Sequence, residues 1–131
     1  MADAAVIADY MVSPVCAYYW QPLGFLRQQL LLNSFTFLPI VEDNGAVTDR
    51  LVSDLALAAY LGREQTQRKA RLAHSLKTAI EGGLQPTTTI SLPLDTPVQD
   101  ALARMTGPPV LVVSKTDPAR LVGLVTPFDV L

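Results

Sequence analysis

The chain has 131 residues, of which 50% are apolar and 17% are charged, and its formal net charge is −2. This much apolar mass can fill one core, whereas disordered chains are rich in charge and poor in aliphatic residues. The acidic balance and the lack of a basic stripe disfavour a nucleic-acid-binding domain. The apolar runs are strand-sized, so membrane insertion is not expected, because a spanning helix needs roughly 20 apolar residues.

The N-terminal segment carries no basic run, so it does not predict a secretory signal, and we expect a cytoplasmic protein. Cys16 is the only cysteine and cannot form an intramolecular disulfide, so we interpret it as a small buried hydrophobe. His74 is the only histidine, and we interpret it as a surface residue. No Cys/His cluster has metal-ligand spacing, and no nucleophile or acid–base constellation is present. We therefore expect no metal site and no enzyme activity.

The two halves of the chain repeat one pattern in the same order. Gln21-Pro22-Leu23 corresponds to Thr96-Pro97-Val98, and each proline is placed at the start of a helix, where its missing N–H is harmless. Farther along, Arg50-Leu51-Val52-Ser53 corresponds to Gly123-Leu124-Val125-Thr126. One supersecondary unit used twice is the simplest interpretation.

The first unit is predicted from its periodicity. Leu23, Leu26 and Leu30 share one helix face, and Ser53 can cap a second helix that carries Leu55 and Leu61. Around these helices we expect a strand at 14–17, a buried strand at 37–41, a turn at 42–45 and a return strand at 46–52.

The second unit repeats this order. We expect a strand at 87–91, a helix from Val98 to Met105, a buried strand at 110–113, a turn at 115–118 and a return strand at 121–125. Thr126 and Pro127 predict a further helix start, but the chain stops at Leu131, so we expect a truncated or short final helix.

Between the units, Leu72, Leu76 and Ile80 recur every four residues and predict one amphipathic helix over 63–81, ended by Gly82-Gly83. Its outer face is basic, which is typical of a solvated helix surface; the basic residues are Arg63, Arg68, Lys69, Arg71 and Lys77.

The repeated unit resembles a tandem pair of cystathionine-β-synthase-type (CBS) domains, the arrangement called a Bateman module. The most specific resemblance is Leu121-Val122-Gly123-Leu124-Val125-Thr126-Pro127-Phe128-Asp129, which matches the family's closing pattern. Asp9-Tyr10-Met11 with Ser13-Pro14-Val15 resembles its opening, and 37–43 resembles its central strand and turn.

The resemblance implies a mixed α/β (α+β) fold in which two β-α-β-β-α units pack sheet to sheet with pseudo-twofold symmetry. The implied divisions are a first unit at 1–62, a linker helix at 63–83 and a second unit at 84–131. Two clefts lie between such units.

Many modules of this family bind AMP, ADP, ATP or S-adenosylmethionine in these clefts, relay occupancy to an attached enzyme or transporter domain, and form disc-like homodimers. The resemblance places the ligand-binding residues of the second cleft at Thr87, Thr88, Val110, Thr126 and Asp129. Thr126 suits a phosphate or ribose oxygen, Asp129 can accept from two ribose hydroxyls, Thr87 and Thr88 would contact the base, and Val110 would form a wall. The alternative is that Thr126 only caps its helix and Asp129 only favours the helix dipole.

The first unit departs from the family pattern. Ala56 stands where the ribose aspartate would be, Arg50 replaces the glycine that corresponds to Gly123, and Asp54 is placed to point elsewhere. We therefore expect this cleft to be empty or adapted to another ligand. The alternative function for the chain is a ligand-free dimerisation or docking domain, for which Tyr18-Tyr19-Trp20 offers an aromatic contact.

Overall fold

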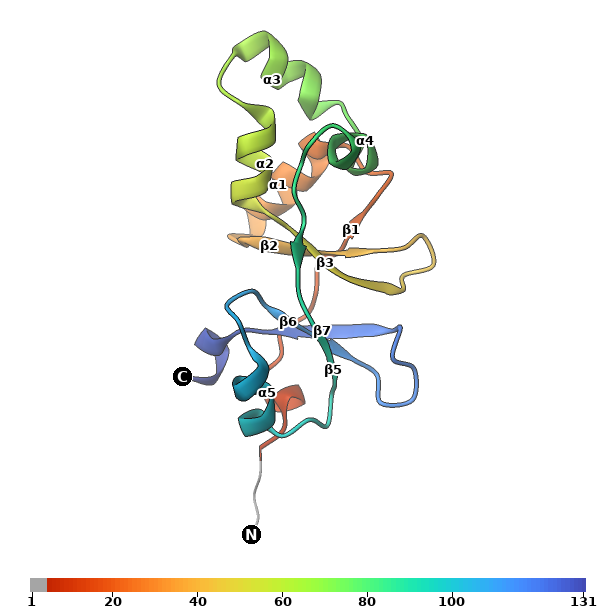
Figure 1. The fold of residues 1–131 in the computed structure, drawn as a ribbon, viewed down its shortest axis with the longest axis vertical. Helices are drawn as coiled ribbons and strands as arrows, with labels where there is room; N and C mark the ends of the chain where they lie inside the picture. The colour runs from red at the N-terminus through yellow and green to blue at the C-terminus, as the bar shows by residue number, and fades with distance from the viewer. Residues whose placement is uncertain (1–4) are drawn as a thin grey trace.

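The computed structural model describes residues 5–131 and contains two small β-sheets that face each other (Figure 1). The first sheet has the order β1 (Ala17–Tyr18), β2 (Phe37–Val41), β3 (Val47–Ser53), β4 (Thr87–Thr88). The second has the order β5 (Ser91–Pro93), β6 (Val110–Val113), β7 (Leu121–Val125). In each, a parallel strand flanks an antiparallel hairpin, so the predicted mixed α+β class is confirmed, whereas the strand expected at 14–17 begins only at Ala17.

The two hairpins share an irregularity as well as an order. The register of β2 against β3 shifts between Ile40 and Val41, and that of β6 against β7 shifts between Val112 and Val113. All four residues of β6 are buried, as are the last four of β2, which explains why both strands are unbroken apolar runs. The shared shift is a structural sign of the repeat.

Helices cover the outer faces of the two sheets (Figure 1). The first unit carries α1 (Leu23–Asn33) and α2 (Asp54–Leu61), and the second carries α5 (Val98–Arg104) and the 3-10 helix η2 (Pro127–Val130). The predicted caps are confirmed: the Ser53 hydroxyl accepts a hydrogen bond from the Ala56 N–H, and the Thr126 hydroxyl accepts one from the Asp129 N–H.

The prediction of a single helix over 63–81 is wrong. The segment forms α3 (Gln65–Leu72) and α4 (Leu76–Glu81), with a break where Ser75 caps the second helix. The break between α3 and α4 frees the His74 carbonyl, which accepts a hydrogen bond from the Leu23 N–H at the start of α1 over 2.9 Å. The break also turns His74 inward, so its interpretation as a surface residue is wrong: it is half-buried, and its Nδ1 lies 2.8 Å from the Tyr60 hydroxyl.

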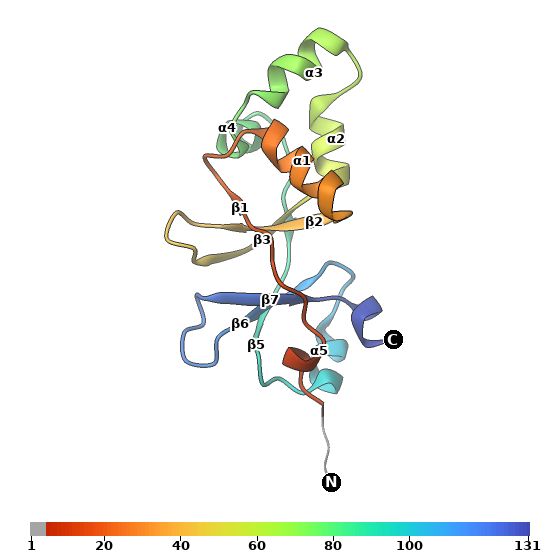
Figure 2. The same ribbon diagram turned by 180° about the vertical axis from the view of Figure 1, so that it is seen from behind.

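The opening segment of each unit lies on the sheet of the other unit. β4 pairs with β3 of the first sheet before the chain passes to β5 in the second, so the expected strand at 87–91 is divided between the sheets. At the N-terminal end, the short 3-10 helix η1 (Ile7–Asp9) lies beside α5 (Figure 2), and Ile7 is fully buried in the second core. Packing therefore crosses the sequence boundaries drawn at residues 62 and 84.

Within residues 5–131, three clusters of apolar side chains hold the layers together. One lies under α1, α2 and α4, and another lies under α5 and η1. The third sits between the sheets and is built on Leu51, Leu111 and Leu124. This last cluster forms the contact between the two sheets.

Candidate ligand-binding site

A pocket of about 240 Å³ lies where β7 and η2 of the second unit meet the first unit. Its volume is below the roughly 300–1,000 Å³ of typical small-molecule sites, so a larger ligand would extend out of it. The lining residues are Val12, Ser13, Ser34, Phe35, Thr36, Phe37, Pro109, Leu124, Thr126 and Asp129.

Thr126 and Asp129 form a reciprocal cap at the start of η2. The Asp129 Oδ2 accepts from the Thr126 N–H over 2.8 Å and from its hydroxyl over 3.0 Å, and the Asp129 N–H donates to the Thr126 hydroxyl oxygen over 3.3 Å. This Thr-x-x-Asp spacing closes the first turn of the helix. Within residues 5–131, Asp129 Oδ1 accepts no hydrogen bond, so the carboxylate that caps the helix still has one oxygen for a ligand in the pocket.

The N-terminal segment forms one wall of the pocket. The Val12 N–H donates to the Leu124 carbonyl over 2.8 Å, and the Leu124 N–H donates back to Val12 over 3.0 Å. This pair of hydrogen bonds fixes Ser13 beside the start of η2. Val12 and Ser13 are residues of the pocket that were not predicted from the sequence.

The loop between α1 and β2 forms the opposite wall. Ser34 has a left-handed backbone with φ of 54° and ends α1, and the Phe35 N–H donates to the Leu30 carbonyl over 3.0 Å. This compact turn brings residues 34–37 to the pocket. The pocket is therefore bounded by both units, and a ligand in it would contact both.

Three of the residues assigned to the second cleft do not line this pocket. Thr87 and Thr88 pair with Leu51 and Arg50 in the first sheet, and Val110 is buried in the core of the second unit. Thr87 and Thr88 do not line the pocket because the opening segment of the second unit pairs with the sheet of the first unit.

The sequence repeat itself indicates that Val12 and Ser13 line this pocket. The register that aligns Pro22 with Pro97 also aligns Val12 with Thr87 and Ser13 with Thr88. Since each opening segment lies on the sheet of the other unit, Val12 and Ser13 occupy at this pocket the place assigned to Thr87 and Thr88.

The corresponding residues of the first unit make different contacts. The hydroxyl of Ser53 caps α2, Ala56 offers no acceptor, and the exposed Asp54 accepts a hydrogen bond from the Leu55 N–H. The Arg50 Nη1 lies 3.4 Å from the Tyr19 hydroxyl. These contacts agree with the departure of this unit from the family pattern.

Two residues singled out by the sequence have no polar role at the pocket. Burial raises the pKa of the Cys16 thiol, which is half-buried. Trp20 is 64% exposed and lies against Tyr18, with ring centroids 6.2 Å apart.

Over residues 5–131, no group of three or more His, Cys, Asp or Glu side chains is arranged to hold a metal ion. In the same range, the helices are all too short or too polar to cross a membrane.

Residues 84–131 match the sequence model of the CBS domain family. Comparison with curated proteins gives no match. Solved structures match almost the whole chain.

The protein CBSX2 from Arabidopsis thaliana has a TM-score of 0.72 and 17% identity, over 98% of this chain and 92% of its own. CBSX2 solved in complex with AMP has a TM-score of 0.69 and 19% identity, over 95% and 92%. The CBS domain pair of protein MJ0100, in complex with 5′-methylthioadenosine and S-adenosyl-L-methionine, has a TM-score of 0.68 and 19% identity, over 98% and 94%. Residues 84–131 therefore match the CBS domain family by sequence, and the whole chain has the fold of a tandem CBS-domain pair, the Bateman module.

Proposed function

We propose that this chain is a regulatory module that binds an adenosine-type ligand in the pocket of Thr126 and Asp129. The observation that carries the proposal is the lining of that pocket by both units, next to a carboxylate with an available oxygen. Two solved structures with the same fold, at 19% identity, hold AMP in one case and S-adenosyl-L-methionine with 5′-methylthioadenosine in the other, which supports this ligand class.

The chemistry of the pocket suits a nucleoside. Ribose hydroxyls need an acceptor, which Asp129 Oδ1 supplies, and an adenine ring needs apolar walls such as those of Phe35, Phe37 and Leu124. Ser13 adds a hydroxyl that can donate to a ribose or phosphate oxygen, and the Thr126 hydroxyl, which donates its proton to Asp129 Oδ2, can still accept from a ribose hydroxyl. AMP, ADP, ATP and S-adenosylmethionine all present this nucleoside portion.

Regulation follows from the shared lining. A ligand that touches both units favours the relative orientation in which both sets of contacts form, by as much as its affinities for the two states differ. The orientation would then be relayed to a partner or to an attached enzyme or transporter domain.

The test is calorimetric titration of the wild type and Asp129→Ala with AMP, ATP and S-adenosylmethionine. A hydrogen bond to a charged acceptor contributes about 1.5–3 kcal/mol, so Asp129→Ala is expected to weaken binding by roughly tenfold or more. Asp100→Ala is the matched control, because Asp100 is an exposed carboxylate in the first turn of α5 and does not line the pocket.

Equal affinities of the wild type and Asp129→Ala would remove Asp129 from the site. Because Asp129 also caps η2, Asp129→Asn is the second variant: its amide oxygen can still accept the capping bonds, but it carries no charge. Loss of affinity in both variants, with unchanged thermal unfolding of Asp129→Asn, supports ligand binding by the carboxylate.

A second candidate function, a ligand-free dimerisation or docking domain, is favoured by exposed apolar side chains. Leu31 and Leu32 on α1 are 63% and 71% exposed, and Leu55 on the neighbouring α2 is 77% exposed (Figure 1). Contiguous exposed apolar surface marks interaction sites. We propose a homodimer for either function, and light scattering is expected to give twice the mass of 14.2 kDa. A dimer that shows no thermal shift with any nucleotide would favour the docking domain.

A further inference from the structure

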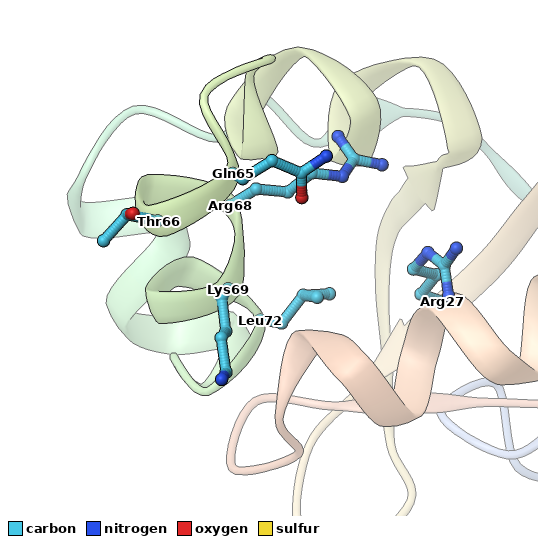
Figure 3. Close-up of a pocket in the computed structure, with 6 residues that line it drawn as sticks. All are labelled: Arg27, Gln65, Thr66, Arg68, Lys69 and Leu72. Atoms are coloured by element: carbon cyan, nitrogen blue, oxygen red, sulfur yellow. The ribbon is translucent and has the colours of Figure 1, made fainter.

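A second pocket, of about 570 Å³, lies between α1 and α3, far along the chain and in space from η2 (Figures 1 and 3). Arg27 on α1 faces the side chains of α3 across the opening (Figure 3). The lining residues are Arg27, Gln65, Thr66, Arg68, Lys69 and Leu72. Three of the six are cations, and they come from two different helices.

The positive charge of this pocket is not neutralised by ion pairs. Within residues 5–131 the one salt bridge joins Lys115 to Asp95, in the second unit. The nearest acidic residue along α3 is Glu64, and its carboxylate accepts hydrogen bonds from the N–H groups of Thr66 and Gln67 at the helix start.

One carboxylate, that of Asp54, lies close enough to reduce the positive electrostatic potential of the pocket. Asp54 lines an adjoining pocket of about 230 Å³ together with Arg27 and Arg68, without an ion pair to either. This neighbour provides a test, because its removal should make the basic pocket more attractive to an anion.

The pocket is built on helices that other contacts hold in place. The Arg68 Nη1 donates to the Gly62 carbonyl over 2.8 Å, and Arg71 donates to the Tyr60 carbonyl with its guanidinium carbon 4.6 Å from the centre of the Tyr60 ring. A Cβ on Gly24 would lie 3.4 Å from the Leu72 carbonyl oxygen, so α1 and α3 approach closely at that point. Arg27 and Lys69 make none of these contacts and are exposed.

We propose that this pocket binds a small polyphosphate anion, independently of the nucleoside pocket at Thr126 and Asp129. Guanidinium groups match phosphate oxygens in pairs, an ammonium adds a mobile point charge, and Gln65 and Thr66 add neutral donors. The volume suits a small molecule with two or three phosphates. Inorganic polyphosphate and the phosphate chain of a nucleotide share this chemistry.

The first experiment is calorimetric titration with inorganic tripolyphosphate at low and at physiological salt. Arg27→Ala and Lys69→Ala are each expected to weaken binding by about tenfold or more, since each removes charge-assisted hydrogen bonds. Lys77→Ala is the control: Lys77 is an exposed lysine of α4 outside the pocket, so its loss changes the net charge equally. Asp54→Asn is expected to tighten binding, and higher salt to weaken it.

The second experiment locates the ligand and distinguishes its source. Tripolyphosphate is expected to shift the amide resonances of Gln65 to Leu72 and not those of Thr126 to Asp129, whereas adenosine, which has no phosphate, should leave α3 unchanged. ATP is expected to shift α3 in Asp129→Ala as well as in the wild type. An absence of heat with tripolyphosphate, an equal loss in Lys77→Ala and Lys69→Ala, or equally tight binding of an oligoglutamate peptide would overturn the proposal.

Discussion

Gly123 in β7 faces Met11 of the N-terminal segment so closely that a Cβ at position 123 would lie 2.6 Å from the Met11 Sδ. Met11 packs against the second core, and the adjacent Val12 is hydrogen-bonded to Leu124. The glycine is therefore required by a close approach between chain segments. At the corresponding position of the first unit, Arg50 carries a long side chain instead.

Gly123→Ala is expected to destabilise the protein by about 1–3 kcal/mol, because the added methyl must displace a packed side chain. Met11→Ala removes the two nearest atoms, so the double variant is expected to be less destabilised than the sum of the single variants. Urea unfolding of the four proteins measures this coupling. Additive effects would show that Met11 does not occupy the space in front of Gly123.

Tyr60→Phe is expected to lower the free energy of unfolding by about 0.5–1.5 kcal/mol, since it removes the hydroxyl that bonds to His74 while keeping the ring under Arg71. Tyr10→Phe is the control, because the Tyr10 side chain is 40% exposed and its hydroxyl makes no hydrogen bond within residues 5–131. Thermal or urea unfolding gives both values. Equal stabilities of Tyr60→Phe and wild type would contradict the hydrogen bond.

The parts of the fold that could be predicted are those that depend on local sequence patterns. Unbroken apolar runs marked β2 and β6, and Ser53 and Thr126 marked helix starts, because caps and buried strands depend on residues close in sequence. The repeat then supplied the order of elements. These signals do not depend on how the units are assembled.

The parts that could not be predicted depend on contacts between distant segments. Leu72, Leu76 and Ile80 keep a helical period, but the helix breaks before Ser75, where the backbone of α1 takes up the freed carbonyl of His74. The lining of the candidate pocket shows the same division: Thr126 and Asp129 belong to a local motif, whereas Ser13 reaches the pocket only because each opening segment lies on the sheet of the other unit.

Glu64→Gln is expected to be less stable than wild type near neutral pH, and the difference is expected to shrink in acid. Hydrogen bonds from the Gln67 and Thr66 N–H groups hold the pKa of Glu64 below its usual value of 4.5 in the folded state. A group with a lowered folded pKa contributes stability above its unfolded pKa and loses it as the pH falls through the folded pKa. Urea midpoints at about pH 7 and about pH 3 test this, and a difference independent of pH would contradict it.

Ile7→Ala is expected to destabilise the whole protein by about 2–5 kcal/mol, although Ile7 lies far in sequence from the core that it fills. Ile7 is 0% exposed, and its N–H donates to the Thr96 carbonyl over 2.9 Å, so the second unit is incomplete without the N-terminal segment. Leu102→Ala is the control in the same unit, since that side chain is 42% exposed and its loss is expected to cost less than about 1 kcal/mol.

The same contact predicts how the two units unfold. Because the N-terminal segment completes the second core and β4 completes the first sheet, neither unit has all its packing within one half of the sequence. Ile7→Ala should therefore shift a single unfolding transition, seen equally by the fluorescence of Trp20 in the first unit and by far-ultraviolet circular dichroism of the whole chain. Two separated transitions, with the Trp20 signal unaffected by Ile7→Ala, would mean that the units fold independently and that the exchanged segments contribute little to stability.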